Sequence, residues 1–282
     1  ALFFVDAQGR FAAVFTPRVP LVPALLGDDK PKPATEAETG PLDVKLGGDE
    51  HKRYFLHGLA NFDALRGQIY NVRGVGHGDL LRGWKLLVVM PGGDGGPDFA
   101  PFVGNIRANA LGEDWLVAQL VAPKWDDAQG ETNVWPTKKN PYPKMKFACE
   151  ELFADVLADV GKRCKLDPKF LHVLAWSSSG SLAYTLLVQE KSPVTGAYVA
   201  MSVFKPDLLP SLKGAKGKRV YVLHSPTDFI PIRMAETARD QLGAQGADVG
   251  YATYEGGHGW HGDVFGLLRA GFEFLAKGSK SK

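Results

Sequence analysis

The sequence predicts an α/β fold in which helices cover both faces of a mostly parallel central sheet. Several strand-like runs, such as WKLLVVM and KFLHVLAW, are almost continuously apolar, and strands that are buried on both faces have this composition. Helical periodicities lie between the later runs, and this alternation favours parallel strands joined by helices. With 282 residues, of which 45% are hydrophobic, the chain is long enough to bury one large core.

The first 40 residues predict an extension ahead of this fold. LFFVDAQGRFAAVF has two apolar arms around DAQG, which predicts a hairpin. GDDKPKPATEAETGP is rich in proline and charge, which is typical of a linker or a meandering surface segment. We therefore expect an extension over residues 1–40, an α/β domain over residues 41–277 and a disordered basic tail over residues 278–282.

Strand and helix patterns follow one another along the rest of the chain. The predicted strands are RYFLHG, QIYNVRG, WKLLVVM, WLVAQLV, KFLHVLAW, GAYVAMSV, RVYVLHS and VGYATYE. The helical periodicities cover Phe99–Ala110, Met145–Gly161, Gly180–Gln189, Ile232–Leu242 and Asp263–Ala276. In such a sheet, ligands bind at the carboxyl ends of the strands. Functional residues are therefore expected in the loops that directly follow strands.

Composition argues against several classes of function. The net charge is +2, with acidic and basic residues interspersed, so no nucleic-acid surface is expected. No apolar run reaches the roughly 18 residues of a membrane span. Cys149 and Cys164 lie at the two ends of one predicted helix, about 20 Å apart, which is too far for a disulfide, so both are predicted to be free and buried. Because the chain does not begin with Met, we expect either a removed leader or a trimmed sequence, and a leader favours a secreted or periplasmic location.

Four strand exits carry residues that can do chemistry. In chain order they are PGGDGG after KLLVVM, SSSGS after FLHVLAW, SPTDFIP after RVYVLH and GGHGWHG after YATYE. They supply a glycine-rich turn, a serine cluster, an aspartate and a histidine. A serine hydroxyl becomes a good nucleophile when a base takes its proton and a third group orients that base. The four exits contain every group that this chemistry needs.

The order and spacing of these exits resemble those of α/β-hydrolase esterases, in which Ser, Asp and His follow one another along the chain. The resemblance runs from about Leu42 to Ala276 and is strongest to small carboxylesterases and to the polyhydroxybutyrate-depolymerase and feruloyl-esterase group. HSPTDFIP resembles their H-G-x-x-D-x-x-V-P, and GGHGW resembles their G-G-H-G-F/W. AWSSSG departs from their G-x-S-x-G, because Ala175 and Ser179 stand at the glycine positions. The resemblance implies an α/β-hydrolase fold and a serine esterase without a cofactor.

Steric requirements favour Ser177 as the nucleophile. A nucleophile on a sharp strand-to-helix turn needs small residues two positions before and after it. Ser177 has Ala175 and Ser179 there, whereas Ser178 would have Trp176 two residues before it. Ser179 has small neighbours but would start the helix late. Ser178 and Ser179 are the alternatives.

Asp228 and His258 complete the predicted triad. Asp228 follows the strand RVYVLH after a short turn that contains proline, although by itself it would be interpreted as an ordinary turn residue. His258 stands at the histidine position of the family motif, so the resemblance implies that it is the base. His261, three residues later, is the alternative base; otherwise it caps the last helix or faces solvent.

The glycine-rich exit predicts part of an oxyanion hole. No lysine follows it in the phosphate-loop pattern, so a nucleotide phosphate site is not predicted. In α/β-hydrolases this exit supplies one backbone N–H, and the residue after the nucleophile supplies the other. The resemblance therefore assigns Gly93, with Gly92 as the alternative, and Ser178.

Four tryptophans near strand exits predict an apolar wall for an aromatic or alkyl acyl group, with core or rim packing as the alternative interpretation. They are Trp176, Trp260, Trp125 and Trp135. Only KPDLLPSLKGAKGK separates AYVAMSVF from RVYVLHS, so we expect no separate cap domain. An open site suits small esters as well as polymeric ones.

These features predict a carboxylic ester hydrolase that works through a Ser–His–Asp triad and an acyl-enzyme, on feruloyl-type, alkyl or polyester substrates. A serine peptidase or amidase on the same fold and a non-catalytic binding protein are alternatives. A further alternative is a zinc site in which His258 and His261 bind the metal with Asp263 or Glu255. That site would leave the serine turn and Asp228 without a role.

Overall fold

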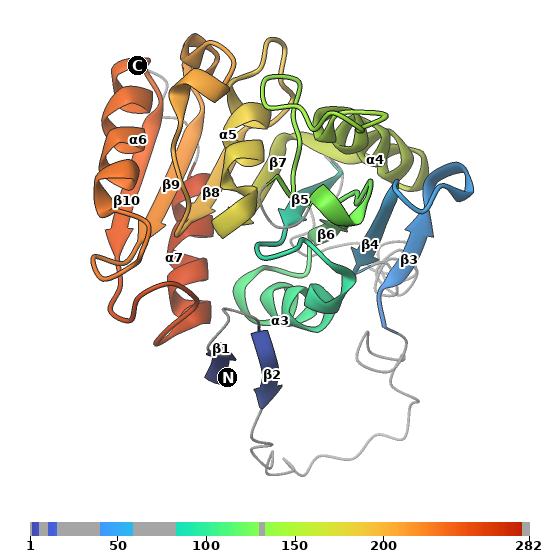
Figure 1. Ribbon diagram of the computed structural model, residues 1–282, viewed down its shortest axis with the longest axis horizontal. Helices are drawn as coiled ribbons and strands as arrows, with labels where there is room; N and C mark the ends of the chain where they lie inside the picture. Colours follow the sequence, from blue (N-terminus) through green and yellow to red (C-terminus); the bar gives the residue numbers. More distant parts are fainter. Residues whose placement is uncertain (1, 6–10, 16–39, 59–82, 130–132, 278–282) are drawn as a thin grey trace, which may run out of the picture.

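One mixed sheet forms the centre of the molecule (Figure 1). The structure is a computed structural model that describes residues 2–5, 11–15, 40–58, 83–129 and 133–277. Eight described strands lie side by side in the order β10-β9-β8-β7-β5-β6-β4-β3. They are β3 (Leu42–Lys45), β4 (Arg53–His57), β5 (Trp84–Met90), β6 (Trp115–Leu120), β7 (Leu166–Trp176), β8 (Gly196–Ala200), β9 (Arg219–His224) and β10 (Asp248–Thr253). From β10 to β6 in this order, adjacent strands all pair parallel. Strand β4 pairs antiparallel with both β6 and β3. The predicted mostly parallel sheet is confirmed.

Helices cover both faces of this sheet (Figure 1). They are α3 (Ala100–Ala110), α4 (Cys149–Arg163), α5 (Gly180–Val188), α6 (Ile232–Ala244) and α7 (Val264–Ala276). Phe153 of α4, Leu186 of α5 and Leu242 of α6 belong to one core cluster. Ile106 of α3 and Phe272 of α7 belong to a second one. The predicted helix layers on the two faces are therefore confirmed.

Strand β5 shows why the central runs are so apolar. Leu86, Val88 and Met90 pack in the cluster under α4, α5 and α6. Leu87 and Val89 pack in the cluster under α3 and α7. Successive side chains of a strand point to opposite faces, so a strand covered on both sides buries every residue.

The smaller elements agree with the sequence patterns in most places. β1 (Leu2–Val5) pairs antiparallel with β2 (Phe11–Phe15), as the hairpin pattern predicts. Cys149 and Cys164 are free and buried, as predicted. The turn DAQG, residues 27–39 of the predicted linker, the predicted strand QIYNVRG and the basic tail lie outside the described residues.

Two details differ from the sequence predictions. The sequence analysis did not predict β3, because its alternation of apolar and polar residues covers only four residues, three of which are exposed. Helix α4 begins at Cys149 and not at Met145. The N–H of Cys149 donates to the carbonyl of Pro136 at 2.9 Å, so the preceding residues form a turn that docks on the 133–140 segment.

The connection between β8 and β9 leaves no room for a cap domain. Residues 201–218 contain two 3₁₀ helices, η5 (Pro206–Leu208) and η6 (Leu212–Ala215). The expectation that no cap domain is inserted here is confirmed. Separately, none of the described helices is both long and apolar enough to cross a membrane.

The topology places a ligand site at the ends of β5 and β7. The chain passes from β5 to β6 on one side and later forms β7 on the other side of β5. Connections that leave neighbouring parallel strands in opposite directions open a crevice at the carboxyl ends of those strands. The loops after β5 and β7 border this crevice, and the loops after β9 and β10 lie along the same edge.

Candidate active site

Ser177 sits on a sharp turn between β7 and α5. Trp176 at the end of β7 is extended, and Ser177 follows with a φ of 56°. This left-handed conformation is strained for a residue with a side chain, and it is the conformation of the nucleophile turn in α/β-hydrolases. The chain then continues through η4 (Ser177–Ser179) into α5. The turn therefore holds Ser177 at the carboxyl end of the sheet.

The other two serines of the cluster make structural hydrogen bonds. Ser179 is fully buried; its Oγ donates to the carbonyl of Met90 at 2.6 Å and accepts from the N–H of Trp176 at 3.0 Å. The Oγ of Ser178 donates to the carbonyl of Gly93 at 2.8 Å. These two hydroxyls join the exits of β5 and β7, which leaves Ser177 as the nucleophile candidate that the geometry favours.

Ser202 supports the turn from the end of β8. Its Oγ donates to the carbonyl of Ser177 at 2.6 Å. The contact requires glycine at position 180, because a Cβ there would overlap the Ser202 side chain. Sequence reasoning did not identify Ser202. A small polar residue just after a buried strand that ends at the site is the signal that could have identified it.

Ser177, His258 and Asp228 form one hydrogen-bonded chain. The Oγ of Ser177 lies 2.8 Å from Nε2 of His258. Nδ1 of His258 lies 2.9 Å and 3.0 Å from the two carboxylate oxygens of Asp228. The Asp228 side chain is fully buried, whereas that of His258 is 20% exposed. An imidazole held between a hydroxyl and a buried carboxylate can take the hydroxyl proton and keep one tautomer while it does so.

The loop that carries His258 is fixed by a buried phenol. The hydroxyl of Tyr254 lies 3.0 Å from the carbonyl of Gly257 and 2.7 Å from that of Gly259, and it donates to this pair. Burial, and to a lesser degree the charge of Asp228, raises the pKa of Tyr254 above its ordinary value, so the hydroxyl keeps its proton. Since the two glycines flank His258, the phenol holds the backbone on both sides of the imidazole.

Ser225 links the histidine loop to the loop that carries Asp228. Its Oγ accepts from the N–H of Gly257 at 3.1 Å and from that of Thr227 at 3.3 Å. Because one buried hydroxyl binds both loops, it fixes the position of the carboxylate relative to the imidazole. Sequence reasoning missed both residues: Tyr254 lies in no pattern that marks catalysis, and Ser225 lies in the acid motif but at a position to which the motif gives no catalytic role.

Hydrogen bonds within the loop that carries Asp228 (the acid loop) also fix its backbone. Asp228 accepts through Oδ1 from the N–H of Ile230 at 2.7 Å. Nε2 of the buried His224 donates to the carbonyl of Ile230 at 2.8 Å. Between these anchored residues, the side chain of Phe229 points outward and is 76% exposed. Phe229 was not singled out from the sequence, although an aromatic residue in a polar turn beside the predicted acid was a usable signal.

The predicted oxyanion segments lie against each other. Gly93 has a φ of 59°, which favours glycine, and its carbonyl binds the side chain of Ser178. Gly92 packs so closely on Trp176 that a Cβ there would overlap the indole. The structure thus brings Gly93 and Ser178 together beside Ser177, and their role as oxyanion donors stays a prediction.

His261 is exposed and stands apart from this chain of hydrogen bonds. Its ring stacks near that of Tyr254, with centroids 6.3 Å apart. Asp263 caps α7, because its side chain accepts from the N–H of Gly266 at 2.9 Å; His261 therefore faces solvent and does not cap the helix. Among the described residues no group of three metal-ligating side chains comes together. Both ring nitrogens of His258 already face Ser177 and Asp228, so this geometry gives no support to the zinc alternative.

The four predicted wall tryptophans divide between the two faces of the sheet. Trp176 and Trp260 are buried, and their ring centroids lie 5.8 Å apart in the cluster under α3 and α7. Trp135 is also buried, but it packs in the opposite cluster, and its N–H donates to the carbonyl of Pro91 at 3.1 Å. Trp125 is half-buried and stacks on His51 at 4.6 Å. These contacts agree with the alternative interpretation of core or rim packing, and a role of the four tryptophans as a substrate wall stays a prediction.

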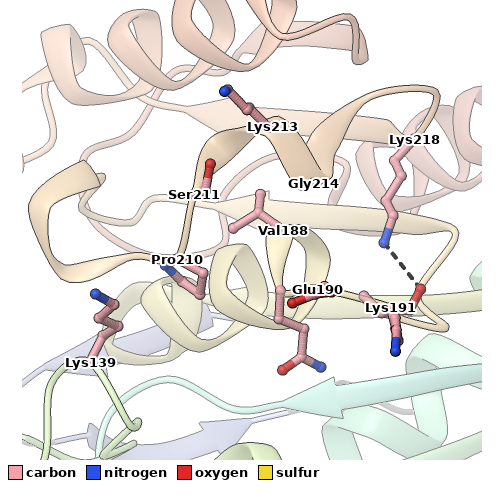
Figure 2. Close-up of a pocket in the computed structure, with 11 residues that line it drawn as sticks. Lys139, Val188, Glu190, Lys191, Pro210, Ser211, Lys213, Gly214 and Lys218 are labelled. Carbon is pink, nitrogen blue, oxygen red and sulfur yellow. Dashed lines mark hydrogen bonds between the residues drawn. The ribbon is translucent and has the colours of Figure 1, made fainter.

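A separate hollow of about 640 Å³ lies between the C-terminal end of α5 and η6 (Figure 2). Its lining includes Val188, Glu190, Lys191, Lys213 and Lys218, and none of the triad residues. The ammonium of Lys218 donates to the carbonyls of Leu187 and Ser192, and burial lowers the pKa of this lysine to about 8. The hollow is therefore distinct from the candidate active site.

Comparisons with known proteins agree with this architecture. No protein-family model and no curated protein matches the sequence. A carboxylesterase from Mesorhizobium loti superimposes with a TM-score of 0.55 and 15% identity, over 83% of this chain and 98% of that one. The α/β-hydrolase enzyme MGS-M1 from a Medee basin deep-sea metagenome library gives 0.53 and 14%, over 83% and 93%. A thermostable esterase gives 0.54 and 16%, over 83% of this chain and 61% of that one.

Identities this low report on the fold and not on the activity. The matches extend over most of the chain, and the sheet order, the two helix layers and the turn after β7 point the same way. The chain has the α/β-hydrolase fold.

Proposed function

We propose that the protein is a serine-dependent carboxylic ester hydrolase that works through an acyl-enzyme. The observation that carries the proposal is the chain of hydrogen bonds from Ser177 through His258 to Asp228, with 2.8 Å and 2.9 Å at its closest contacts. The strained φ of Ser177 supports the same role, because strain of this kind concentrates at functional sites.

The first half of the reaction transfers the acyl group to Ser177. Nε2 of His258 takes the hydroxyl proton while Oγ attacks the ester carbonyl carbon, and the carbonyl electron pair moves onto oxygen. When this intermediate collapses, the bond to the alcohol oxygen breaks and Nε2 returns the proton to that oxygen. Asp228 accepts from Nδ1–H throughout and stabilises the imidazolium.

The second half releases the acid. Water loses a proton to Nε2 and attacks the acyl carbon, and the proton then returns to Oγ as the acyl bond breaks. In both halves the backbone N–H groups of Gly93 and Ser178 stabilise the negative oxygen, because hydrogen-bond donors held in place beforehand need no reorganisation during the reaction.

Carboxylic esters are the substrate class that we propose. Two of the similar solved structures, those with TM-scores of 0.55 and 0.54, are a carboxylesterase and an esterase. The short connection over residues 201–218 supports a site that accepts extended as well as small esters. Feruloyl-type esters and polyesters belong to this proposed range.

A panel of esters tests the proposal. It contains p-nitrophenyl esters of increasing chain length, feruloyl esters, an aliphatic and an aromatic polyester, and a matched set of p-nitroanilides. We expect turnover of esters well above that of anilides, complete loss after a serine-directed phosphonate, and no loss with a chelator. Equal or faster anilide cleavage would identify an amidase instead, and inactivation by the chelator alone would favour a metal enzyme.

A further inference from the structure

The aromatic ring of Phe229 lies directly against the imidazole of His258. Their centroids are 4.3 Å apart and their planes are tilted by 40°. Phe229 is nevertheless 76% exposed, and the other large hydrophobic side chain that is exposed among the described residues is Leu42, at 40%. An exposed phenylalanine beside the candidate base presents an apolar surface where a substrate would enter.

The backbone of the acid loop directs this ring toward solvent. The Asp228 side chain is buried and bound to His258. Ile230 is buried, and both its N–H and its carbonyl are hydrogen-bonded. Since the residues on both sides are anchored, the exposed position of Phe229 follows from the fixed geometry of the acid loop.

We propose that Phe229 binds the alcohol portion of the ester and selects esters whose alcohol carries a flat apolar group, such as an arylmethyl ester. This inference rests on the proposed function as an ester hydrolase. Nε2 of His258 must return its proton to the departing alcohol oxygen, so the alcohol portion lies next to the imidazole. A ring in contact with the imidazole is therefore beside the alcohol, and an aromatic group there gains an aromatic contact with Phe229.

The acyl portion has a different position in the reaction. It stays bonded to Oγ of Ser177 after the alcohol has left, beside the segments of Gly93 and Ser178. Phe229 therefore acts on acyl-enzyme formation, which kcat/KM reports. It does not act on the hydrolysis of that acyl-enzyme, which is the same for every ester of one acid.

The test compares ethyl, benzyl and naphthylmethyl acetate. All three release alcohols of similar reactivity, so only the apolar area of the leaving group changes. We expect Phe229→Ala to lower kcat/KM for the two aromatic esters about fivefold to tenfold, and to change that for ethyl acetate less than twofold. Phe229→Tyr keeps the ring and should retain the wild-type ratios.

Leu42→Ala is the matched control, because it also removes an exposed apolar side chain, on β3 at the far edge of the sheet from β10. It should leave all three values unchanged, and neither alanine variant should lower the melting temperature by more than about 2 °C, since both residues are exposed. An equal loss on all three esters would overturn the inference, because it would mean that Phe229 acts only on the imidazole. A loss that follows the acyl chain, in butyrate or benzoate esters of ethanol, would also overturn it. Wild-type protein that cleaves none of these esters would instead refute the proposed function.

Discussion

The turn that carries Ser177 and the loop that carries His258 are positioned by different means. The serine turn is short, partly buried and held by several contacts, including those of Ser179 with Met90 and of Ser202 with the carbonyl of Ser177. The histidine loop is rich in glycine and has positive φ angles at 256, 257, 259 and 262. Two side chains hold its backbone: the hydroxyl of Tyr254 binds the carbonyls of Gly257 and Gly259, and the Oγ of Ser225 accepts from the N–H of Gly257.

This difference has an energetic consequence. Where several contacts hold one group, the loss of one leaves the others in place. Where one hydroxyl holds two carbonyls, its loss frees both at once, and glycines resist disorder least. We therefore expect the reacting groups to be equally indispensable, but the supports of the histidine loop to matter more than those of the serine turn.

The largest effect is expected for Ser177→Ala. It removes the nucleophile, and hydrolysis of p-nitrophenyl acetate should fall by roughly 10⁴-fold or more while the melting temperature is retained. Ser178→Ala is the control within the same cluster and should keep most activity, because it removes only the hydroxyl that binds the carbonyl of Gly93 and retains the backbone N–H. The reverse pattern would show that the nucleophile is one residue further along.

His258→Ala should be as inactive as Ser177→Ala, in the range of 10⁴-fold or more. The double variant should be no worse, because residues that act as a unit do not contribute additively. His261→Ala is the control three residues away and should retain most activity, since His261 is exposed. An inactive His261→Ala beside an active His258→Ala would move the base to the other histidine.

Asp228→Asn should lower kcat by up to about 10⁴-fold, because an amide favours the wrong tautomer of the imidazole. Steady-state kinetics should show the loss in kcat, with little change in KM. The exposed Asp207→Asn provides a control for the loss of one negative charge. Near-normal kcat in Asp228→Asn would exclude this residue as the acid.

Tyr254→Phe sharpens the comparison between the two regions. It removes the single O–H donor that the carbonyls of Gly257 and Gly259 share, and the loss of a donor to half-buried acceptors, at about 1.5 to 2 kcal/mol, corresponds to a loss in kcat of roughly 10- to 30-fold. Tyr251→Phe is the matched control on β10, since its hydroxyl has no hydrogen-bond partner in the described structure. A Tyr254→Phe enzyme with wild-type kcat would show that the glycine loop holds its shape without the phenol.

Ser202→Ala should have the smallest effect. One hydrogen bond to the carbonyl of Ser177 is lost, while Ser179 still fixes the turn, so we expect a threefold to tenfold decrease in kcat. The exposed Ser211→Ala should change nothing. A larger loss for Ser202→Ala than for Tyr254→Phe would reverse the comparison.

The sequence predicts most of the fold because burial determines both the apolar pattern of a segment and the element that the segment forms. The two-sided strands and the five predicted helices follow from apolar patterns that the two core clusters explain. The edge strand β3 has only four residues, three of them exposed, so its short apolar alternation is too weak to predict a strand. Its position depends on pairing with β4, which is a contact between segments and not a property of LDVK.

The candidate site is predictable to the extent that local motifs carry it. Ser177, Asp228 and His258 follow strands, and parallel strands bring their ends together whatever lies between them. Trp125 and Trp135 show the limit of this reasoning, because nearness to a strand end in sequence does not reveal the face on which a side chain packs. Ser202 acts on a backbone carbonyl of another segment and Tyr254 on carbonyls of its own loop, and only coordinates reveal such partners.

The close approach of position 180 to Ser202 also limits how this protein can change. A mutational survey would score nearly every replacement of Gly180 as inactive, although a residue buried behind the turn needs no contact with substrate. Such a survey would place Gly180 beside Ser177 in a map of essential positions, for a purely steric reason. The obstacle is conditional, because Ser202→Gly removes the atoms nearest to a new Cβ and leaves a side-chain carbon of Val199 at 3.0 Å. A replacement of Gly180 is therefore tolerated only after position 202 has changed to a smaller residue.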